Sequence, residues 1–299
     1  MAQTVVEVEG RRLPLSNLDK VLYPEVGTTK AEVIDYYARI APTMAPHLAG
    51  RGVTLRRFPD GVEGGSFFEK RCPGHRPDWV GTVLGPGDRN GDIHYCCLDS
   101  APALVWAANM AALEIHAPMA AGDIETPTMC VFDLDPGEGT TIVECADVAL
   151  DIRHVLDGFG LSGYPKTSGS KGLQVYVPLN TPHGHEDASA FALAVAQLLE
   201  RAHPEHVVSN MKRSLRRGKV LVDWSQNSRH KTTIAPYSLR ARPQPTVSTP
   251  VSWDEVEAAA DGDPLSFDIA AVLARVDERG DLFAATLTGE QRLPDQGGR

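Results

Sequence analysis

Long apolar runs are missing from this sequence of 299 residues. No stretch approaches the roughly 18 to 20 apolar residues that a helix needs to span a bilayer. The N-terminus also lacks the basic start, apolar centre and small-residue cleavage site of a secretion signal. We therefore expect a cytoplasmic protein that has no membrane partner.

Cysteine is scarce, and no Cys-x-x-Cys pair occurs. The five cysteines are an odd number, and the adjacent Cys96 and Cys97 would point to opposite faces of a strand. This pattern favours neither a disulfide framework nor a zinc ribbon. We therefore predict buried free thiols at all five positions. These positions are Cys72, Cys96, Cys97, Cys130 and Cys145.

Positive charge is in deficit, because the formal net charge is −10. Nucleic-acid-binding proteins are often basic, so the total charge argues against that class. However, residues 246–299 contain 11 acidic and 4 basic side chains, which leaves a net charge of only −3 for the remainder. Within that remainder, KRSLRRGK at residues 212–219 places five positive charges in eight residues. A basic surface is therefore still allowed, since the local field matters more than the total charge.

Repeats and low-complexity tracts are also absent, and the two kinds of apolar pattern alternate along the chain. The patterns predict helices over residues 27–48, 100–118, 141–160 and 188–204. They predict strands over residues 129–136 and 218–227, a strand that runs into a turn over residues 52–61, and a loop followed by a strand over residues 168–179. Interleaved helices and strands favour an α/β or α+β fold. We expect a core over residues 1–245 and an acidic helical tail over residues 246–299 that packs on the core.

Two aspartates interrupt the apolar run CVFDLDPGEGT at residues 130–140. On a strand, Asp133 and Asp135 share one face, while Phe132 and Leu134 point to the other. Close carboxylates repel each other and lose solvation, and a divalent cation relieves both penalties. Mg²⁺ and Mn²⁺ prefer such oxygen ligands. The alternative is an exposed strand end with two solvated aspartates.

A third carboxylate, Asp223, ends the strongly β-prone run KVLVD at residues 219–223. Two strands could bring Asp133, Asp135 and Asp223 together. Three carboxylates can hold two cations in the arrangement that serves in-line phosphoryl transfer.

The segment KTSGSKG at residues 166–172 places small residues and a lysine before a strand. Such a loop can direct backbone N–H groups and the Lys171 ammonium at phosphate oxygens. The hydroxyls of Ser168 and Ser170 lie nearby in the sequence. The loop is not a Walker A motif, because its spacing differs and no helix follows directly. An ordinary turn is the alternative.

Further cations and aromatic rings are candidates for binding nucleotides or nucleic acid. Arg56 and Arg57 could grip phosphate, and one ring of Phe67 or Phe68 could stack on a base. His116 ends the helix predicted over residues 100–118, where a structural role is the alternative. The basic run could follow a phosphate backbone, and a solvated charged surface is its alternative. The other candidate cations are Lys212, Arg213, Arg216, Arg217, Lys219, Lys231 and Arg240.

Six segments taken together resemble the polymerase domain of bacterial ligase D, a member of the archaeo-eukaryotic primase superfamily. They are DKVLYPEVGTTKAEVIDYY, SFFEK, LEIHAP, VFDLDPGEG, TSGSKGLQVYVPL and KVLVDWSQNSRHKTTIAPYSLR, and they follow the order of that family over most of residues 15–245. The resemblance implies a primase-type α/β fold with a central mixed sheet, similar to an RNA-recognition motif, that is flanked by helices. The predicted core over residues 1–245 would then be the primase-polymerase core.

The resemblance also implies an activity. It implies template-directed addition of nucleotides, preferably ribonucleotides, to primer 3′ ends in gap filling or non-homologous end joining. The implied substrates are nucleoside triphosphates and gapped, 5′-phosphorylated or broken DNA, and the implied cofactors are two Mn²⁺ or Mg²⁺ ions. Ku and a separate DNA ligase are candidate partners, and the nucleoid in the cytoplasm is the implied location.

The same resemblance implies the role of each candidate residue. The metal-binding and catalytic carboxylates would be Asp133, Asp135 and Asp223. The nucleotide would be bound by His116, Ser168, Ser170, Lys171, Gly172, Arg240, Lys231 and Arg57. The DNA would be bound by Arg56, Phe67, Phe68, Lys70, Lys212, Arg213, Arg216, Arg217, Lys219 and Gln226.

The chain departs from the family's pattern at two points. It lacks the Lys-x-Asp-Gly motif of ligases and a nuclease module, so we expect a free-standing paralogue, with the isolated domain of a larger protein as the alternative. Relatives often carry Lys-Arg where this chain has Arg56 and Arg57, and the two cations bind phosphate differently. Three other functions stay open: a primer-independent primase, a non-catalytic DNA-end-bridging module and a metal-dependent phosphohydrolase.

Overall fold

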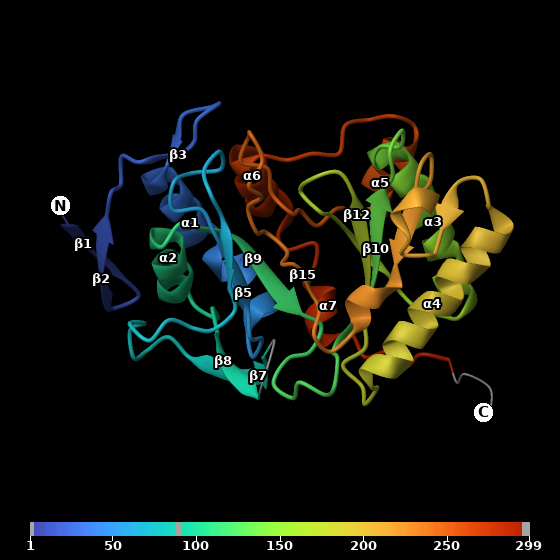
Figure 1. The fold of residues 1–299 in the computed structure, drawn as a ribbon, viewed down its shortest axis with the longest axis horizontal. Coiled ribbons are helices and arrows are strands. Elements are labelled where there is room, and N and C mark those ends of the chain that lie inside the picture. The colour runs from blue at the N-terminus through green and yellow to red at the C-terminus, as the bar shows by residue number, and fades with distance from the viewer. Residues whose placement is uncertain (1–2, 88–90, 295–299) are drawn as a thin grey trace. The chain divides into compact units, whose positions relative to one another are not determined.

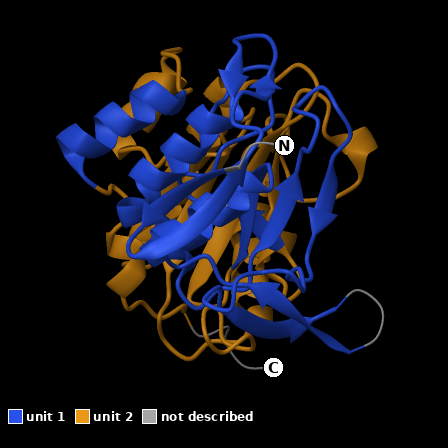
Figure 2. Cartoon of the chain, turned by 90° about the vertical axis from the view of Figure 1, so that its left-hand side faces the viewer, with its two compact units in different colours: residues 1–118, 232–248, 267–280 blue, residues 119–231, 249–266, 281–299 orange. Residues whose placement is uncertain are grey.

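The computed structural model describes residues 3–87 and 91–294. The chain forms two compact units (Figure 2). Unit 1 contains residues 1–118, 232–248 and 267–280, and unit 2 contains residues 119–231, 249–266 and 281–299. Residues 246–299 are divided between the two units. The domain boundary expected at residue 245 stays a prediction.

Unit 1 contains a four-stranded antiparallel sheet with the strand order β15-β9-β5-β6. These strands are β5 (Thr54–Arg57), β6 (Phe67–Glu69), β9 (Ala112–Pro118) and β15 (Thr232–Ile234). The helices of this unit are α1 (Lys30–Leu48), α2 (Ala101–Asn109) and α6 (Ile269–Arg279). Thr29 and Glu32 form the predicted capping box at the start of α1. All three helices contribute side chains to one apolar core.

Three two-stranded sheets complete unit 1. They pair β1 (Gln3–Val8) with β2 (Arg11–Ser16), β3 (Val21–Tyr23) with β4 (Thr28–Thr29), and β7 (Thr82–Pro86) with β8 (Asp92–Cys96).

Unit 2 contains a five-stranded sheet with the order β11-β12-β10-β14-β13. Its strands are β10 (Met129–Pro136), β11 (Tyr164–Thr167), β12 (Leu173–Pro178), β13 (Val207–Val208) and β14 (Val220–Asp223). The pair of β13 and β14 is parallel, and the other three pairs are antiparallel. The sheet is therefore mixed, as the family resemblance predicts.

Helices α3 (Ile142–Gly158) and α4 (His185–Ala202) lie on the same side of β10 in Figure 1. The ring of Phe132 on β10 meets that of Phe191 on α4, with 6.1 Å between the ring centroids. This contact identifies the face of β10 that the helices cover. Helix α5 (Trp253–Ala260) packs on α3, where Arg153 pairs with Glu257 at 2.9 Å. The short helix α7 (Ala285–Thr288) follows Phe283, whose ring meets that of Tyr176 on β12.

The helix predicted over residues 100–118 is wrong in its second half. Helix α2 ends at Asn109, Ala111 has a left-handed φ of 56°, and β9 begins at Ala112. Residues on β9 pair with β5 on one side and β15 on the other. The apolar run is thus a short helix followed by a buried strand, which periodicity alone does not separate. His116 therefore lies on a strand.

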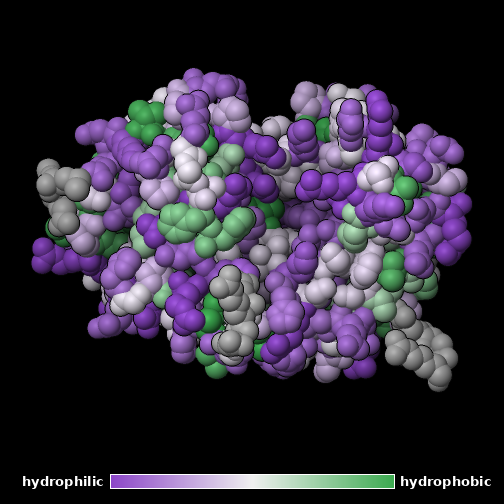
Figure 3. Space-filling view, viewed as in Figure 1, coloured by the Kyte–Doolittle hydropathy of each residue, from purple (hydrophilic) through white to green (hydrophobic). Residues whose placement is uncertain are grey.

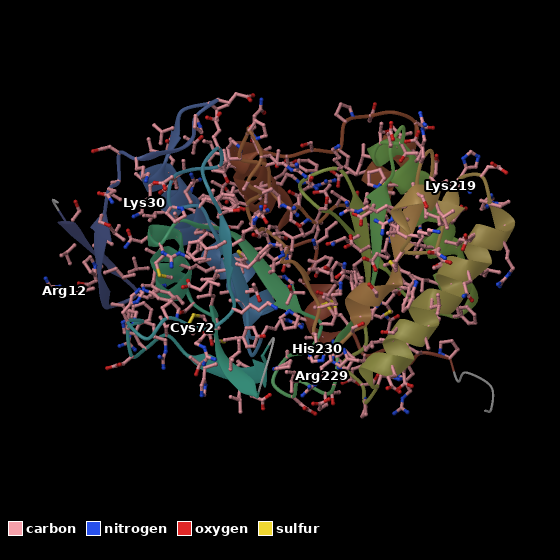
Figure 4. All side chains as sticks on the ribbon, in the orientation of Figure 1. Arg12, Lys30, Cys72, Lys219, Arg229 and His230 are labelled. Atoms are coloured by element: carbon pink, nitrogen blue, oxygen red, sulfur yellow. A yellow bond between two sulfur atoms is a disulfide. The ribbon has the colours of Figure 1, made fainter. Side chains whose placement is uncertain are left out.

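The prediction of five free thiols is also wrong. Cys72 and Cys96 form a disulfide, with 4.8 Å between their Cα atoms (Figure 4 labels Cys72). A hydrogen bond from the backbone N–H of Cys72 to the carbonyl of His94 brings the two segments together. Sequence spacing gives no sign of this approach. The other three cysteines are buried free thiols, as predicted.

The face of the molecule in Figure 3 is mostly hydrophilic, and its hydrophobic side chains form small separate patches. Over residues 3–87 and 91–294, no helix combines the length and the apolar character that a membrane span requires.

Candidate active site

Strands β10 and β14 place three carboxylates on one face of the sheet of unit 2. Asp133 is the direct Cα partner of Asp223 in this antiparallel pair. Asp135 lies two residues further along β10 and so faces the same side as Asp133. Leu134, between them, is fully buried on the side of α3 and α4. The two strands therefore bring together the three aspartates that the sequence singles out.

The environment of Asp133 disfavours its charged form. Burial raises the pKa of Asp133 to about 7, and the negative charges of Asp135 and Asp223 add to this effect. A hydrogen bond from Gln174 and the positive charge of Lys166 oppose it. A divalent cation would remove the mutual repulsion, so the donor chemistry of the three carboxylates fits such an ion.

Asp223 also has a structural role. Its Oδ1 atom accepts hydrogen bonds from the backbone N–H of Ser225 at 2.9 Å and from the Ser225 hydroxyl at 2.6 Å. Its Oδ2 atom accepts one from the side-chain amide of Gln226 at 2.9 Å. Asp223 thereby caps the 3-10 helix Trp224–Asn227. Among the described residues, no three His, Cys, Asp or Glu side chains are arranged to hold a metal ion as they stand. A cation shared with Asp133 would therefore compete with this cap.

The loop predicted to bind phosphate lies directly beside β10. A Cβ atom on Gly172 would be 2.2 Å from the carbonyl oxygen of Leu134, so this position requires glycine. The hydroxyl of Ser168 accepts hydrogen bonds from the backbone N–H groups of Ser170 and Gly172 and shapes the loop. Lys171 is exposed.

A cavity of about 460 Å³ adjoins this loop within unit 2. It is lined by residues 140–142 at the start of α3, by residues 167 and 169–172, and by residues 264–266. Ser170, Lys171 and Gly172 therefore line open space that a ligand can enter.

The basic segment 212–219 packs against the turn that follows β10. A Cβ atom on Gly137 would be 1.7 Å from the carbonyl oxygen of Arg216. The Gly137 N–H donates to the carbonyl of Lys219 at 2.9 Å, and the Gly218 N–H donates to that of Glu138 at 2.8 Å. The basic segment is thereby fixed next to the strand that carries Asp133 and Asp135.

The five cations of this segment differ in exposure. Lys212, Arg213 and Arg217 are exposed. Arg216 donates to the carbonyl of Met211, and Lys219, labelled in Figure 4, donates to that of Pro204. The first three are therefore the more accessible to a phosphate backbone. Lys231, the last residue of segment 119–231 of this unit, is also exposed.

Unit 1 contains a second cluster, built around the buried carboxylate of Glu114 on β9. Its Oε2 atom lies 3.0 Å from Nε2 of His116 and 3.5 Å from a guanidinium nitrogen of Arg56. Its Oε1 atom accepts hydrogen bonds from Nε of Arg240 at 3.2 Å and from the backbone N–H of Ala241 at 3.1 Å. Glu114 is 2% exposed and thus holds in one place a histidine and two arginines that the sequence predicts to bind ligands.

Burial alone would raise the pKa of Glu114. The hydrogen bond from His116, the positive charges of Arg240 and His116, and the N–H of Ala241 outweigh burial and lower that pKa to about 2. The carboxylate therefore stays ionised and compensates the surrounding cations.

Two exposed aromatic rings lie beside this cluster. Phe67 and Phe68 on β6 are 46% and 58% exposed. The guanidinium of Arg56 lies over the ring of Phe68, and that of Arg57 lies over the ring of Phe67. Arg57 also pairs with Glu69 at 3.0 Å. Such arginine–aromatic pairs present flat surfaces on which bases can stack. Lys70 follows β6 and is half-buried.

The sequence-predicted residues are therefore divided between the units. Unit 1 holds Arg56, Arg57, Phe67, Phe68, Lys70, His116 and Arg240, and unit 2 holds the carboxylates, the residues of loop 168–172, the basic segment, Gln226 and Lys231.

Glu114 and Gln174 contact predicted site residues, and Lys166 contacts Gln174, but the three carry no sequence signal of their own. Glu114 and His116 are two residues apart, which puts them on one face of a strand, but the predicted helix concealed this relationship. Lys166 and Gln174 meet Asp133 only through strand pairing, which the sequence does not specify.

Comparison with known proteins identifies relatives along most of the chain. The family model of the LigD primase-polymerase domain matches residues 29–283. The multifunctional non-homologous end joining protein LigD of Mycolicibacterium smegmatis is 48% identical over 278 residues, which cover 91% of this chain and 36% of that protein. The bifunctional LigD of Bacillus subtilis is 32% identical over 270 residues, covering 90% of this chain and 43% of that protein. The chain thus spans less than half the length of these relatives.

One solved structure is similar over nearly its whole length. It is the polymerase domain of Mycobacterium tuberculosis ligase D in complex with DNA, which matches with a TM-score of 0.87 and 44% sequence identity. The match covers 94% of this chain and 99% of that domain. It confirms the predicted α/β fold, and together with the family model it confirms the resemblance drawn from the sequence motifs.

Proposed function

Because the chain belongs to the LigD primase-polymerase domain family, a family of nucleotidyltransferases, we propose that it adds nucleotides to the 3′ ends of DNA primers under the direction of a template. The observation that carries this proposal is the register of β10 and β14, which places Asp133, Asp135 and Asp223 on one face. In the proposed reaction, the primer 3′-hydroxyl attacks the α-phosphate of a nucleoside triphosphate, and pyrophosphate leaves.

The three aspartates would hold two divalent ions, Mn²⁺ by preference or Mg²⁺. Bound there, the ions supply positive charge that favours deprotonation of the attacking hydroxyl and stabilises the leaving group. The chain's own contribution is the fixed register of the carboxylates and the dense hydrogen bonding that orients Asp133 and Asp223. Such preorganised charge is usually the largest single source of catalysis in phosphoryl transfer.

Each unit contains residues that we propose bind the nucleotide. Lys171, together with Ser168, Ser170 and Gly172, would bind phosphate oxygens in unit 2, where this loop borders the cavity. In unit 1, His116 and Arg240 would bind the triphosphate or the sugar, held ready by Glu114. Arg57 and Lys231 would contribute further positive charge. Ribonucleotides are the expected substrates, on the basis of the family resemblance.

The DNA would be bound by exposed cations and rings. Phe67 and Phe68 would stack on bases, and Arg56 and Lys70 lie beside them in the same unit. In unit 2, Gln226 and the basic segment would contact DNA near the carboxylates. The similar polymerase domain of ligase D was solved in complex with DNA, which supports DNA binding by this chain.

The names of the relatives describe non-homologous end joining proteins, which supports that pathway as the proposed biological setting. Gapped, 5′-phosphorylated or broken DNA would be the substrate, and Ku and a DNA ligase would be the partners. We place the protein in the cytoplasm at the nucleoid, where bacterial DNA breaks occur.

Primer extension tests the proposal directly. The substrate is a labelled primer on a gapped, 5′-phosphorylated duplex, with Mn²⁺ and either ribonucleotides or deoxynucleotides. The wild type should extend the primer and prefer ribonucleotides, and Asp135→Ala should show no extension while remaining folded. Asp157→Ala, which removes an exposed carboxylate on α3, is the matched control and should behave as wild type.

Full activity of Asp135→Ala would overturn the proposed role of the carboxylates. Synthesis on an unprimed single strand would assign the chain to primases instead. No extension by the wild type, with tight and salt-sensitive binding to the same DNA, would favour the end-bridging module.

A further inference from the structure

Four polar side chains occupy one row across the sheet of unit 2. Lys166 on β11 is the Cα partner of Gln174 on β12. Gln174 is also the partner of Asp133 on β10, which is the partner of Asp223 on β14. Direct partners in antiparallel strands have Cβ atoms about 4.5 to 5.5 Å apart. Each side chain in the row can therefore contact the next.

Hydrogen bonds connect the first three members of this row. The Nζ atom of Lys166 donates to Oε1 of Gln174 at 2.6 Å. The hydroxyl of Tyr176 donates to the same oxygen at 3.2 Å. The Nε2 atom of Gln174 donates to Oδ1 of Asp133 at 2.9 Å.

Lys166 determines which end of the Gln174 amide faces Asp133. An ammonium group only donates hydrogen bonds, so it requires the amide oxygen on its own side. The amide NH₂ group must then face Asp133, where it occupies Oδ1 and leaves Oδ2 for another ligand. If the amide were reversed, its oxygen would face the Asp133 carboxylate and its NH₂ group would face the Lys166 ammonium, and both contacts would be repulsive.

The burial of these groups is costly for the fold. Lys166 is 0% exposed and Gln174 is 3% exposed. A buried charge with its partners is often no more stabilising than apolar side chains of the same volume. Stability alone therefore does not explain a lysine here, and its position one residue removed from Asp133 in the row indicates another role.

We propose that Lys166 and Gln174 are positioning residues for the metal site, with Lys166 acting through Gln174 to orient the Asp133 carboxylate toward a divalent ion. This inference rests on the proposed function, because it assumes that Asp133 is a metal ligand. Outer partners of metal ligands typically change metal affinity by roughly 10- to 100-fold when they are removed.

The test measures Mn²⁺ binding to the protein without DNA or nucleotide, by the loss of the free Mn²⁺ signal in electron paramagnetic resonance. Lys166→Met and Gln174→Met remove the two groups while keeping most of the side-chain volume. Each should weaken Mn²⁺ binding by roughly 10-fold or more. Lys30→Met is the matched control, because Lys30 in unit 1 is also a buried lysine that donates to a carbonyl, and its Mn²⁺ affinity should equal that of wild type.

A double-mutant cycle separates positioning from a general structural effect. Because Lys166 acts through Gln174, adding Lys166→Met to Gln174→Met should weaken Mn²⁺ binding little further. Thermal unfolding without metal reports whether each variant is folded. If Lys166→Met does not fold, Gln174→Met alone decides the outcome, because it leaves the lysine in place.

The outcomes are distinguishable from those that test the function itself. Unchanged Mn²⁺ affinity in folded Lys166→Met or Gln174→Met, or strictly additive losses in the double variant, would overturn the positioning proposal while wild-type extension still stood. If the wild type and Asp133→Asn bind Mn²⁺ equally, the metal site of the proposed function is itself wrong.

Discussion

Asp133 and Asp223 lie directly opposite each other on β10 and β14, and each accepts a side-chain amide hydrogen bond, from Gln174 and Gln226 respectively. The two carboxylates are thus held by neutral hydrogen-bond donors, and the positive charge of Lys166 offsets only part of the repulsion that Asp133 experiences. This arrangement stores electrostatic repulsion in the protein without its ions, and it leads to the first prediction.

The stability of the metal-free protein should fall as Asp133 ionises. Burial raises the folded-state pKa of Asp133 to about 7, above its unfolded value of about 3.9. The contribution of this group to stability is therefore fully present below about pH 4 and is lost as the pH rises to about 7. Thermal unfolding between pH 4 and pH 8 in the presence of a chelator should show this loss in wild type.

Asp133→Asn should remove most of that pH dependence, because asparagine does not ionise and its oxygen can still accept from Gln174. The variant should be more stable than wild type at pH 8 without metal. Parallel unfolding profiles for the two proteins from pH 4 to pH 8 would contradict this electrostatic interpretation, and Asp157→Asn should follow wild type throughout.

Glu114 should have the opposite pH dependence. Its folded-state pKa of about 2 lies below the usual value of about 4.3, so its contribution is present above about pH 4 and is lost as the pH falls toward 2. Glu114→Gln leaves His116, Arg56 and Arg240 without their shared anion and should cost roughly 3 to 5 kcal/mol at pH 7. Urea unfolding at pH 7 and pH 3 measures both effects.

The control for Glu114 is Glu257→Gln. Glu257 forms an exposed pair with Arg153, and such pairs contribute about 0 to 1 kcal/mol. Equal losses of stability in the two variants would mean that the Glu114 cluster is not the buried network that the contacts indicate.

Gly137→Ala should destabilise unit 2 and detach the basic segment from the turn after β10. The new Cβ atom would overlap the carbonyl of Arg216, and overpacking of this kind costs roughly 1 to 3 kcal/mol. Gly158→Ala is the matched control, because nothing lies within 4 Å of a Cβ atom there, and it should be neutral or slightly stabilising. Chemical denaturation of both variants checks the difference. Equal stabilities would show that the turn adapts freely.

Reduction of the disulfide between Cys72 and Cys96 should destabilise the protein. The bridge between Cys72 and Cys96 has a sequence separation of 24 residues, for which chain-entropy arguments give roughly 3 kcal/mol. Thiol titration of the unfolded protein should yield the three cysteines that are free in the structure before reduction and all five after it. Five thiols in protein that was never reduced would show that the bridge does not form.

Exposed cations of the basic segment should set the salt dependence of DNA binding. Each lost phosphate contact should reduce the slope of log affinity against log salt by about 0.9. The double variant Arg213→Gln and Arg217→Gln should therefore lower the slope by up to about 1.8. Its affinity for Mn²⁺ in the absence of DNA should equal that of wild type. Binding titrations at several salt concentrations measure the slope. An unchanged slope would place the DNA elsewhere.

The three aspartates of the site could be predicted because each of them lies in a short, local sequence pattern. The spacing of Asp133 and Asp135 specifies a shared face, and the run before Asp223 specifies a strand, so only the pairing of these strands was open. The partners of these residues were not predictable. Lys166 and Gln174 reach Asp133 through cross-strand register, and Cys72 reaches Cys96 through a backbone contact distant in sequence.

His116 shows a different limit. The apolar run from Ala101 to Pro118 has the composition of a buried helix, and only the left-handed backbone at Ala111 divides it into α2 and β9. An alanine carries no turn signal in the sequence, so the division depends on tertiary pairing with β5 and β15.

The row of Lys166, Gln174, Asp133 and Asp223 has a consequence for length variation in this protein. The four residues sit on four strands, and the segments that join those strands can gain or lose residues without changing the row. A one-residue insertion or deletion inside β10 would instead turn both of its aspartates toward α3 and α4 and bring Phe132 and Leu134 to the polar face. Substitutions can thus adjust the properties of the site, whereas a one-residue insertion or deletion within any of these strands would remove that strand's residue from the row.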